Sequence, residues 1–356
     1  MDKYLLVKLN HIGDTLLMTP TIRAIKEKDP NSIIDVVVRK GCESVLTDNP
    51  DISNIFLVSR PEKRERSIRD FKINVITFFK IIFSNRYRYA FDLSNSDRAK
   101  ILVLASRAHV RGINDWRADL GLKRYFFNAF SNYAWGPEHQ VLRDFRTVMD
   151  VLEWDCNPGP LVMSKTQFYA PKQQGVLVGF NPDKKYLVVH PTSRWAYKEW
   201  EISRWAEVAS LLMAGGYQVI ISVGPAEKER SDSERISAMI DGTVYQTYGQ
   251  LTLQNNAALL RGADLFLGVD TAMMHIAAAC QTPSIVLFGP SSEWSWAPWK
   301  CEHRLVLGDC NCKVTRDFIC DKTCIYPCMD SITVERVQSA IVEIIKEKVG
   351  VVNEVE

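Results

Sequence analysis

Short apolar runs alternate regularly with longer amphipathic segments along this chain, and this alternation limits its possible folds to a few. Tyr4–Leu9 is an apolar run with a single lysine, as is typical of a strand buried in a parallel sheet. A helical pattern follows the Gly13-Asp14 pair and ends near Lys28, and Ile33–Arg39 reads as the next strand. Continued along the chain, this rhythm predicts an α/β fold in which helices cover both faces of a parallel sheet.

The alternation runs through the chain twice, with a polar stretch between the two halves. We therefore predict two Rossmann-like, doubly wound domains, at 1–165 and 183–356, joined by a linker at 166–182. In such proteins ligands bind beyond the carboxyl ends of the strands, so we expect the site in the cleft between the domains. The predicted strands are 4–9, 33–39, 54–58, 89–93, 186–190, 217–223, 265–269 and 284–288, and the predicted helices are 15–28, 67–87, 97–107, 139–154, 201–214, 227–240, 253–261, 271–280 and a closing helix at 331–348.

The composition excludes several classes of protein. Apolar residues make up 46% of the chain and charged residues 24%, which is ordinary for a globular protein and excludes disordered and fibrous chains.

The first residues carry neither a basic start nor a small-residue cleavage site, so we expect a cytoplasmic protein. The most apolar helical stretch, Phe71–Phe83, contains Lys72, Asn74 and Lys80 and is too short to span a bilayer. We expect this stretch to pack in the core rather than to lie along a membrane interface.

A block of positive charge lies in the first half. Between Arg60 and Arg124 there are sixteen lysines and arginines against seven acidic residues. Such an excess favours an acidic partner, namely nucleic acid, an anionic membrane, or a phosphorylated or carboxylated substrate, although a solvated basic surface is the simpler alternative. No nucleic-acid-binding motif accompanies the charge, so we expect no nucleic acid partner.

Three strand-to-helix junctions carry the residues that could do chemistry. The first is Lys8–Thr15, where Gly13 would allow a tight turn and Asp14 would sit at the helix start, in the field of the helix dipole. The second is His190–Trp200, where Thr192, Ser193 and Lys198 could grip a phosphate. A plain helix cap and a polar loop are the alternatives for these two junctions.

The third junction is Gly268–His275, at which a strand ends and a helix starts. Free backbone N–H groups at such a helix start suit a pyrophosphate, and His275 falls one turn after Thr271. A capping threonine with a buried, satisfied histidine is the alternative. The turn before Glu227 and Glu229 is a weaker signal of the same kind.

Taken together, these segments resemble the ADP-heptose:lipopolysaccharide heptosyltransferases, glycosyltransferase family 9. The matching segments are KLNHIGDTLLMTPTIRAIK, HPTSRWAYKEW, GPAEKE and GVDTAMMHIAAACQTPSIVLFGPSS, and their order and spacing cover nearly the whole chain. The resemblance implies a GT-B fold, with two Rossmann-like domains facing a central cleft, the acceptor on the N-terminal domain and the donor nucleotide on the C-terminal domain.

The resemblance also implies residue roles. Asp14 matches the family's catalytic aspartate. The proposed donor contacts are Thr192, Ser193, Lys198, Glu227 or Glu229, Asp270, Thr271 and His275, and the proposed acceptor-side residues are Asn10, His11, Gly13 and Arg64.

The implied reaction is the transfer of heptose from ADP-L-glycero-D-manno-heptose to the lipopolysaccharide core. Asp14 would act as general base in a single displacement with inversion, without a required cofactor. Because the acceptor is anchored in the cytoplasmic leaflet, the enzyme would be peripheral on the cytoplasmic face of the inner membrane. A transferase of the same fold with another donor sugar or a protein acceptor is the alternative, and Asp14 argues against a non-catalytic binding protein.

Residues 301–328 are rich in cysteine. Their spacing departs from the paired pattern usual for zinc, yet near thiols could hold a structural zinc or iron, with spare thiols or disulfides as the alternative. The candidate ligands are Cys310, Cys312, Cys320, Cys324 and Cys328.

Overall fold

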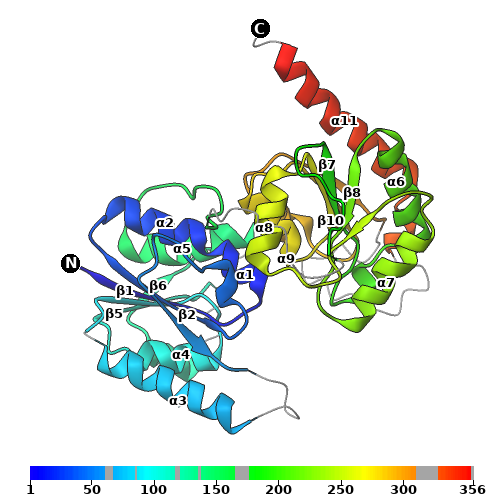
Figure 1. Cartoon of the computed structure of the whole chain (residues 1–356). Coiled ribbons are helices and arrows are strands. Elements are labelled where there is room, and N and C mark those ends of the chain that lie inside the picture. The colour runs from blue at the N-terminus through cyan, green and yellow to red at the C-terminus, as the bar shows by residue number, and fades with distance from the viewer. Residues whose placement is uncertain are drawn as a thin grey trace. The chain divides into compact units, whose positions relative to one another are not determined.

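A computed structural model describes residues 1–60, 67–84, 86–116, 121–134, 138–164, 176–309 and 328–353 of the chain. It divides into two compact units, Met1–Ser164 and Lys165–Glu356, and each contains a parallel sheet with helices packed on it (Figure 1). Residues 166–175 of the predicted linker lie outside the described part.

The N-terminal unit contains a six-stranded parallel sheet in the order β3-β2-β1-β4-β5-β6. Leu5, Leu6 and Val7 of β1 are fully buried, because helices cover both faces of this central strand. Figure 1 shows α3 and α4 on one face of the sheet and α2 and α5 on the other. The elements are β1 (Lys3–Lys8), α1 (Ile12–Leu17), α2 (Thr19–Lys28), β2 (Ile33–Arg39), β3 (Asn54–Val58), α3 (Ile68–Phe83), β4 (Tyr89–Asp92), α4 (Asp97–Ala105), β5 (Val110–Asn114), β6 (Ala129–Ser131) and α5 (Gln140–Leu152), with 3-10 turns η1 (Glu43–Val45) and η2 (Gly121–Phe126).

The first helical region differs from the prediction. The single helix expected up to Lys28 is two helices that meet at Met18, with Pro20 in the first turn of the second. Proline lacks the N–H that a helix interior requires, so it is accommodated where a new helix begins. Gly13 is the second residue of α1 rather than part of a turn before it, so the expected tight turn was wrong.

The C-terminal unit repeats this topology. Its parallel sheet has the order β12-β11-β10-β7-β8-β9, so that in both units the strand order reverses beside the first strand of the sheet. The elements are β7 (Tyr186–His190), η3 (Ala196–Lys198), α6 (Ile202–Ala214), β8 (Gln218–Ile221), α7 (Glu227–Ala238), β9 (Tyr245–Gln246), α8 (Leu253–Gly262), β10 (Leu265–Val269), α9 (Ala272–Ala279), β11 (Ser284–Phe288), α10 (Glu293–Trp296), β12 (His303–Leu307), η5 (Cys328–Ser331) and α11 (Val334–Asn353).

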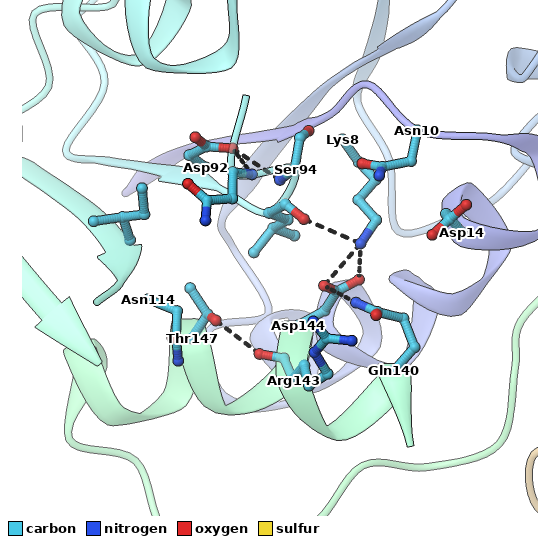
Figure 2. A pocket seen from close by; sticks show the side chains of 13 residues that line it. Lys8, Asn10, Asp14, Asp92, Ser94, Asn114, Gln140, Arg143, Asp144 and Thr147 are labelled. Carbon is cyan, nitrogen blue, oxygen red and sulfur yellow. Dashed lines mark hydrogen bonds and ion pairs between the residues drawn. The ribbon is translucent and has the colours of Figure 1, made fainter. Parts of the chain in front are cut away.

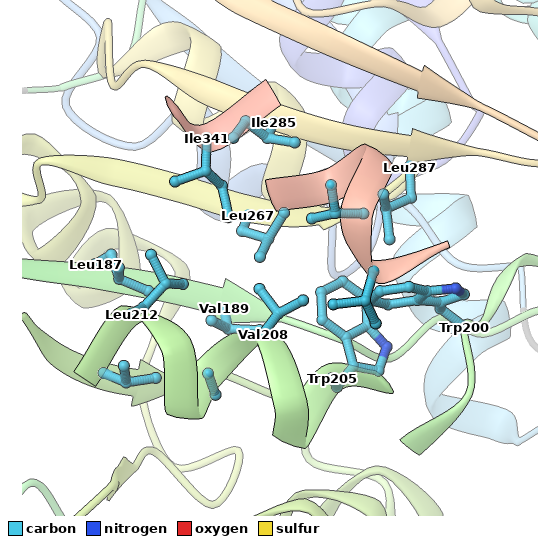
Figure 3. Packing of buried hydrophobic residues seen from close by; sticks show 14 of the residues in the cluster. Leu187, Val189, Trp200, Trp205, Val208, Leu212, Leu267, Ile285, Leu287 and Ile341 are labelled. Carbon is cyan, nitrogen blue, oxygen red and sulfur yellow. The ribbon is translucent and has the colours of Figure 1, made fainter. Parts of the chain in front are cut away.

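One core cluster ties the closing helix to this sheet. Leu187, Val189 and Leu267 on the strands pack against residues of α6 and α11 (Figure 3). Trp200 and Trp205 meet edge to face with ring centroids 5.1 Å apart, and the Trp200 Nε1–H donates to the Ile332 carbonyl at 2.9 Å. The segment after β7 is therefore anchored in the core just beyond the residues predicted to bind phosphate.

The strands that the sequence did not predict are β5, β6, β9 and β12. All four lie in the outer half of a sheet, and β6 and β9 are only three and two residues long. Such short strands lack the length over which a period-2 pattern can be recognised. Across the described ranges, no helix is both long enough and apolar enough to cross a membrane.

Candidate active site

A polar pocket opens where the strand order of the N-terminal sheet reverses. Strands β1 and β4 are neighbours there, and the chain leaves them toward different helices, a position at which open α/β sheets bind ligands. The pocket has a volume of about 180 Å³ (Figure 2). Its polar lining comes from the end of β1 and the start of α1, from the end of β4 and the loop after it, from the end of β5, and from α5. It comprises Lys8, Asn10, Asp14, Asp92, Ser94, Asn95, Asn114, Gln140, Arg143, Asp144 and Thr147.

A buried ion pair forms the floor of this pocket. Lys8 Nζ lies 2.8 and 2.7 Å from the two carboxylate oxygens of Asp144 and also donates to the Leu93 carbonyl at 3.1 Å. Gln140 Nε2 donates to Asp144 Oδ1 at 3.0 Å. Burial raises the pKa of Asp144, and the Lys8 ammonium opposes that shift. Both charged groups are almost fully buried, so loss of either one would leave an uncompensated charge.

A second buried carboxylate stands on the opposite side of the pocket. Asp92 Oδ1 accepts the N–H groups of Ser94 and Asn95 at 2.8 and 2.9 Å. Burial is the main cause that raises the pKa of Asp92 to about 6. Within the described residues, neither Asp92 Oδ2 nor the buried Oδ1 of Asn10 has a hydrogen-bond partner. Buried polar atoms of this kind are rare in native proteins, so these two point to a polar ligand.

Asp14 lies in the first turn of α1 and is partly exposed. Its Oδ2 accepts the backbone N–H of His11 at 3.2 Å, which orients the carboxylate at the helix N-terminus. Figure 2 shows Asp14 beside the Lys8–Asp144 pair at the edge of the pocket. The arrangement places an ionisable oxygen where a bound hydroxyl could reach it.

The other predicted acceptor-side residues are distributed differently. Asn10 lines the pocket, Gly13 is buried in α1, and His11 is exposed at the N-cap of that helix. Arg64 lies outside the described residues.

A second cavity, of about 330 Å³, opens beyond the ends of β2 and β3 and is lined by Leu9, Arg39, Val58, Arg60, Ser96, Asp97 and Arg98. Three guanidinium groups on one cavity suit an anionic ligand.

The reversal point of the C-terminal sheet brings two of the predicted segments together. Strands β7 and β10 are neighbours there, and Gly268 pairs with His190. Lys198, which follows β7, forms an ion pair with Asp270, which follows β10, at 2.6 Å. Both side chains are largely buried, so a charged pair stands where two predicted donor-binding loops meet.

The predicted hydroxyl and carboxylate contacts on this unit are partly engaged with each other. Thr192 Oγ1 donates to Glu229 Oε2 at 2.9 Å, and the Gly224 N–H donates to the same oxygen at 2.6 Å. Ser193 supports the turn, since its Oγ accepts the Trp195 N–H at 3.2 Å. Glu227 is exposed at the first residue of α7. Glu229 therefore holds the turn before α7 against the loop after β7.

The start of α9 has a polar atom without a partner. Thr271 is the N-cap of this helix, yet its side chain makes no capping bond, and its buried Oγ1 has no hydrogen-bond partner in the part of the chain that is described. His275 is buried one turn later, with its ring 6.4 Å from that of Trp296. The capping bond considered as an alternative for Thr271 is thus absent, and its hydroxyl lies beside open helix N–H groups.

His190, the last residue of β7, lies beneath these loops. Burial lowers the pKa of His190 to about 4, so the imidazole is neutral at physiological pH.

Of the predicted metal ligands, only Cys328 lies in the described residues, and it is buried in η5. Cys310, Cys312, Cys320 and Cys324 fall outside them. The described ranges contain no group of three or more His, Cys, Asp or Glu side chains arranged to hold a metal.

Sequence reasoning missed three residues that shape the N-terminal pocket. These are Lys8, Asp92 and Asp144. A signal existed for the first two, since Lys8 interrupts an apolar strand and Asp92 closes another. Asp144 stands 136 residues from Lys8 in a helix of ordinary amphipathic pattern, and no local signal marks it.

Comparison with known proteins identifies the family. The profile of Glycosyltransferase family 9 (heptosyltransferase) matches residues 75–326. The chain is 28% identical over 296 residues to lipopolysaccharide heptosyltransferase 3 of Escherichia coli, covering 81% of this chain and 83% of that protein.

Solved structures share the fold. A family 9 glycosyl transferase from Veillonella parvula superposes with a TM-score of 0.80 at 18% identity and covers 97% of both chains. E. coli heptosyltransferase WaaC with ADP superposes with a TM-score of 0.73 at 20% identity, covering 96% of this chain and 99% of WaaC. The predicted α/β fold of GT-B type is confirmed by these matches. Because the family profile covers well over half of the sequence, the chain belongs to glycosyltransferase family 9, the heptosyltransferases.

Proposed function

We propose that this chain transfers heptose from ADP-L-glycero-D-manno-heptose to the core oligosaccharide of lipopolysaccharide, with inversion and with Asp14 as general base. The related E. coli protein is named a lipopolysaccharide heptosyltransferase, and a WaaC structure holds ADP-2-deoxy-2-fluoro heptose. The observation that carries the proposal is the position of Asp14 at the edge of a polar pocket at the sheet's reversal point.

The acceptor hydroxyl is a poor nucleophile unless a base removes its proton as the new bond forms. Asp14 Oδ2 is held by the His11 N–H, and Oδ1, which has no hydrogen bond within the described residues, is the oxygen we assign to that proton. Asn10 Oδ1 and Asp92 Oδ2 would accept other hydroxyls of the acceptor sugar and orient it. The Lys8–Asp144 pair would keep this floor rigid.

The donor diphosphate is assigned to the C-terminal unit. The leaving ADP gains negative charge on its β-phosphate, which Lys198, the Thr271 hydroxyl and the N–H groups at the start of α9 would stabilise. Asp270 positions Lys198, and His275 is assigned to the same donor-binding turn. Thr192 and Ser193 would form the rim of this subsite, with Glu227 and Glu229 meeting the nucleotide ribose.

In this scheme Asp14 is the base and Asp92 binds the acceptor rather than attacking the donor, so the transfer is a single displacement in which a β-linked donor would give an α-linked product. Lys198 and the helix N-terminus supply the positive charge in this scheme, and it requires no cofactor.

The acceptor's negative charge has a matching surface. Phosphates or acidic sugars of the core would be attracted to Arg39, Arg60 and Arg98, which line the cavity beyond β2 and β3. Because such an acceptor is anchored in a membrane, we place the enzyme as a peripheral protein on the cytoplasmic face of the inner membrane.

A mass-spectrometric assay tests the proposal directly. The purified chain is incubated with ADP-heptose and a panel of truncated core lipopolysaccharides, and separately with other nucleotide sugars and with candidate protein acceptors. A mass increase of one heptose on a core acceptor is the expected result. Transfer only from another nucleotide sugar would contradict the proposed donor, and transfer only to protein would contradict the proposed acceptor. Either result would leave the chain a glycosyltransferase.

A further inference from the structure

Helix α3 contacts the protein through a face that mixes polar and apolar side chains, and it presents several large apolar side chains to the outside. On the inner face, Asp70 accepts from the Ser59 hydroxyl, Asn74 Oδ1 accepts the Ser59 N–H at 2.7 Å, and Thr77 Oγ1 donates to the Leu57 carbonyl at 2.6 Å. Polar hydrogen bonds to β3 and the chain just after it thus hold the helix, and only Thr77 and Ile81 are buried. The core packing expected for Phe71–Phe83 holds for Ile81, which is buried, and in part for Phe78, which packs against the core cluster. It was wrong for Phe71, Ile76, Phe79 and Phe83, which are exposed because these bonds turn the opposite face inward.

The outward face of α3 is aromatic and aliphatic. Ile68 and Phe83 are each 77% exposed, and Phe71 is 69% exposed. Phe79 stacks on Phe83 with ring centroids 5.9 Å apart, and Ile76 is also exposed. Isolated exposed apolar residues are common, but a contiguous set on one helix marks an interaction surface.

The neighbouring helix extends this surface. Helices α3 and α4 pack side by side, and Ile101 and Leu104 of α4 are about half exposed. We refer to Ile68, Phe71, Ile76, Phe79 and Phe83 together with Ile101 and Leu104 as the α3 face.

Cations are distributed among the apolar residues of α3. Arg69, Lys72 and Lys80 are exposed, and Lys72 stands between Ile68 and Ile76 at a spacing of four residues on each side. The one acidic residue of the helix, Asp70, is turned inward and bonded to Ser59 and Ser67. On α3, apolar side chains mixed with cations match the boundary between lipid headgroups and acyl chains, and the exposed acid Asp97 lies at the start of α4.

We propose that the α3 face docks on an anionic lipid bilayer, with the phenylalanines at the acyl boundary and the cations on headgroup phosphates. The helix of sixteen residues would lie along the surface rather than cross it. A second copy of the chain fits this face less well, since a two-fold contact would bring Arg69, Lys72 and Lys80 close to the same cations of the partner copy. The biological purpose of the docking rests on the proposed function, because it would bring the enzyme to a lipid-anchored acceptor.

Vesicle co-sedimentation of the full chain tests the docking without any substrate. The probes are vesicles of phosphatidylcholine alone and vesicles containing one third phosphatidylglycerol. We expect binding to the anionic vesicles that weakens with salt. The double variant Phe79→Gln/Phe83→Gln should lower partitioning by about tenfold or more, because two aromatic side chains no longer leave water. Lys72→Glu/Lys80→Glu should abolish the preference for anionic vesicles.

The control is Leu211→Gln/Met239→Gln, which removes two comparably exposed apolar side chains from the C-terminal unit and should bind vesicles as the wild type does. Unchanged melting temperatures establish that the variants are folded. Equal vesicle binding by the wild type and both α3 variants would overturn the proposal. So would a dimer in sedimentation velocity that the phenylalanine variant dissociates, since the face would then join two copies.

Activity on a soluble truncated core separates this proposal from the proposed function. Both α3 variants should retain that activity and lose activity on acceptor embedded in vesicles. Vesicle binding through the α3 face by a chain that transfers no heptose would overturn the function and leave the docking. Heptose transfer by a chain that does not bind vesicles would overturn the docking and leave the proposed function.

Discussion

At the scale of the residue, the proposed chemistry depends on a carboxylate oriented by one backbone N–H. Asp14→Asn keeps the size and the helix position of the side chain but removes its ability to accept a proton. We expect turnover to fall by about 10²–10⁴, with the melting temperature and ADP affinity near wild type. Glu27→Gln, which neutralises an exposed acid on α2, is the matched control and should be fully active. Near-normal turnover of Asp14→Asn in single-turnover measurements would remove Asp14 from the mechanism.

A second residue gives a prediction about acid stability. Burial lowers the pKa of His190 from 6.5 to about 4 in the folded chain, so the unfolded chain binds more protons between these values. The stability that this neutral imidazole supports is complete above about pH 6.5 and is lost as the pH falls toward 4. The variant His190→Gln has an uncharged side chain at this position. Its free energy of unfolding should therefore fall less between pH 7 and pH 4 than that of the wild type, by up to about 3 kcal/mol. Urea unfolding at several pH values measures this, and parallel curves for the two proteins would contradict it.

At the scale of the element, the donor-side loops depend on how closely β7 and β10 approach. A Cβ added at Gly268 would lie 2.7 Å from the Phe266 ring and 3.0 Å from the His190 carbonyl, which is too close for either to stay in place. Gly268→Ala should therefore destabilise the C-terminal unit by about 1–3 kcal/mol and weaken ADP binding, since both loops start at these strand ends. Gly159→Ala, where a Cβ meets no atom within 4 Å, is the control. Calorimetric ADP affinity equal to wild type would show that the strand ends do not set the donor site.

At the scale of the whole molecule, the basic N-terminal half should make acceptor binding depend on salt. Exposed charges are screened over about 10 Å at 0.1 M ionic strength. The KM for a soluble core acceptor should therefore rise with salt, while the donor KM, set by the largely buried Lys198–Asp270 pair, should rise less. Arg39→Glu and Arg98→Glu, on the cavity beyond β2 and β3, should raise the acceptor KM at low salt by about tenfold. An acceptor KM insensitive to salt and to these charge reversals would show that the cavity beyond β2 and β3 does not bind the acceptor.

The class of fold could be predicted from the sequence alone, and the same local patterns predict candidate positions for ligands. Apolar runs such as Tyr4–Leu9 and Ile33–Arg39 predict buried strands because side-chain burial follows a local period. The segments at Asp14 and Asp270 follow such strands, and the order of the motifs indicated the family that the comparisons confirmed. These features are local, so they can be read from neighbouring residues.

The contacts between residues far apart in the chain could not be predicted from the sequence. Lys8 and Asp144 form an ion pair although they are 136 positions apart, and Lys198 and Asp270 do so although they are 72 positions apart. Strand order and helix packing bring these residues together, and no local sequence pattern encodes that order. The α3 helix is the clearest case. Its sequence places apolar residues around much of its circumference, and the hydrogen bonds of Asn74 and Thr77 to the β3 segment decide which side faces inward. Because hydrogen-bond partners in another element select the buried face, the sequence of the helix alone could not show that Phe71, Phe79 and Phe83 face outward while Phe78 packs against the core.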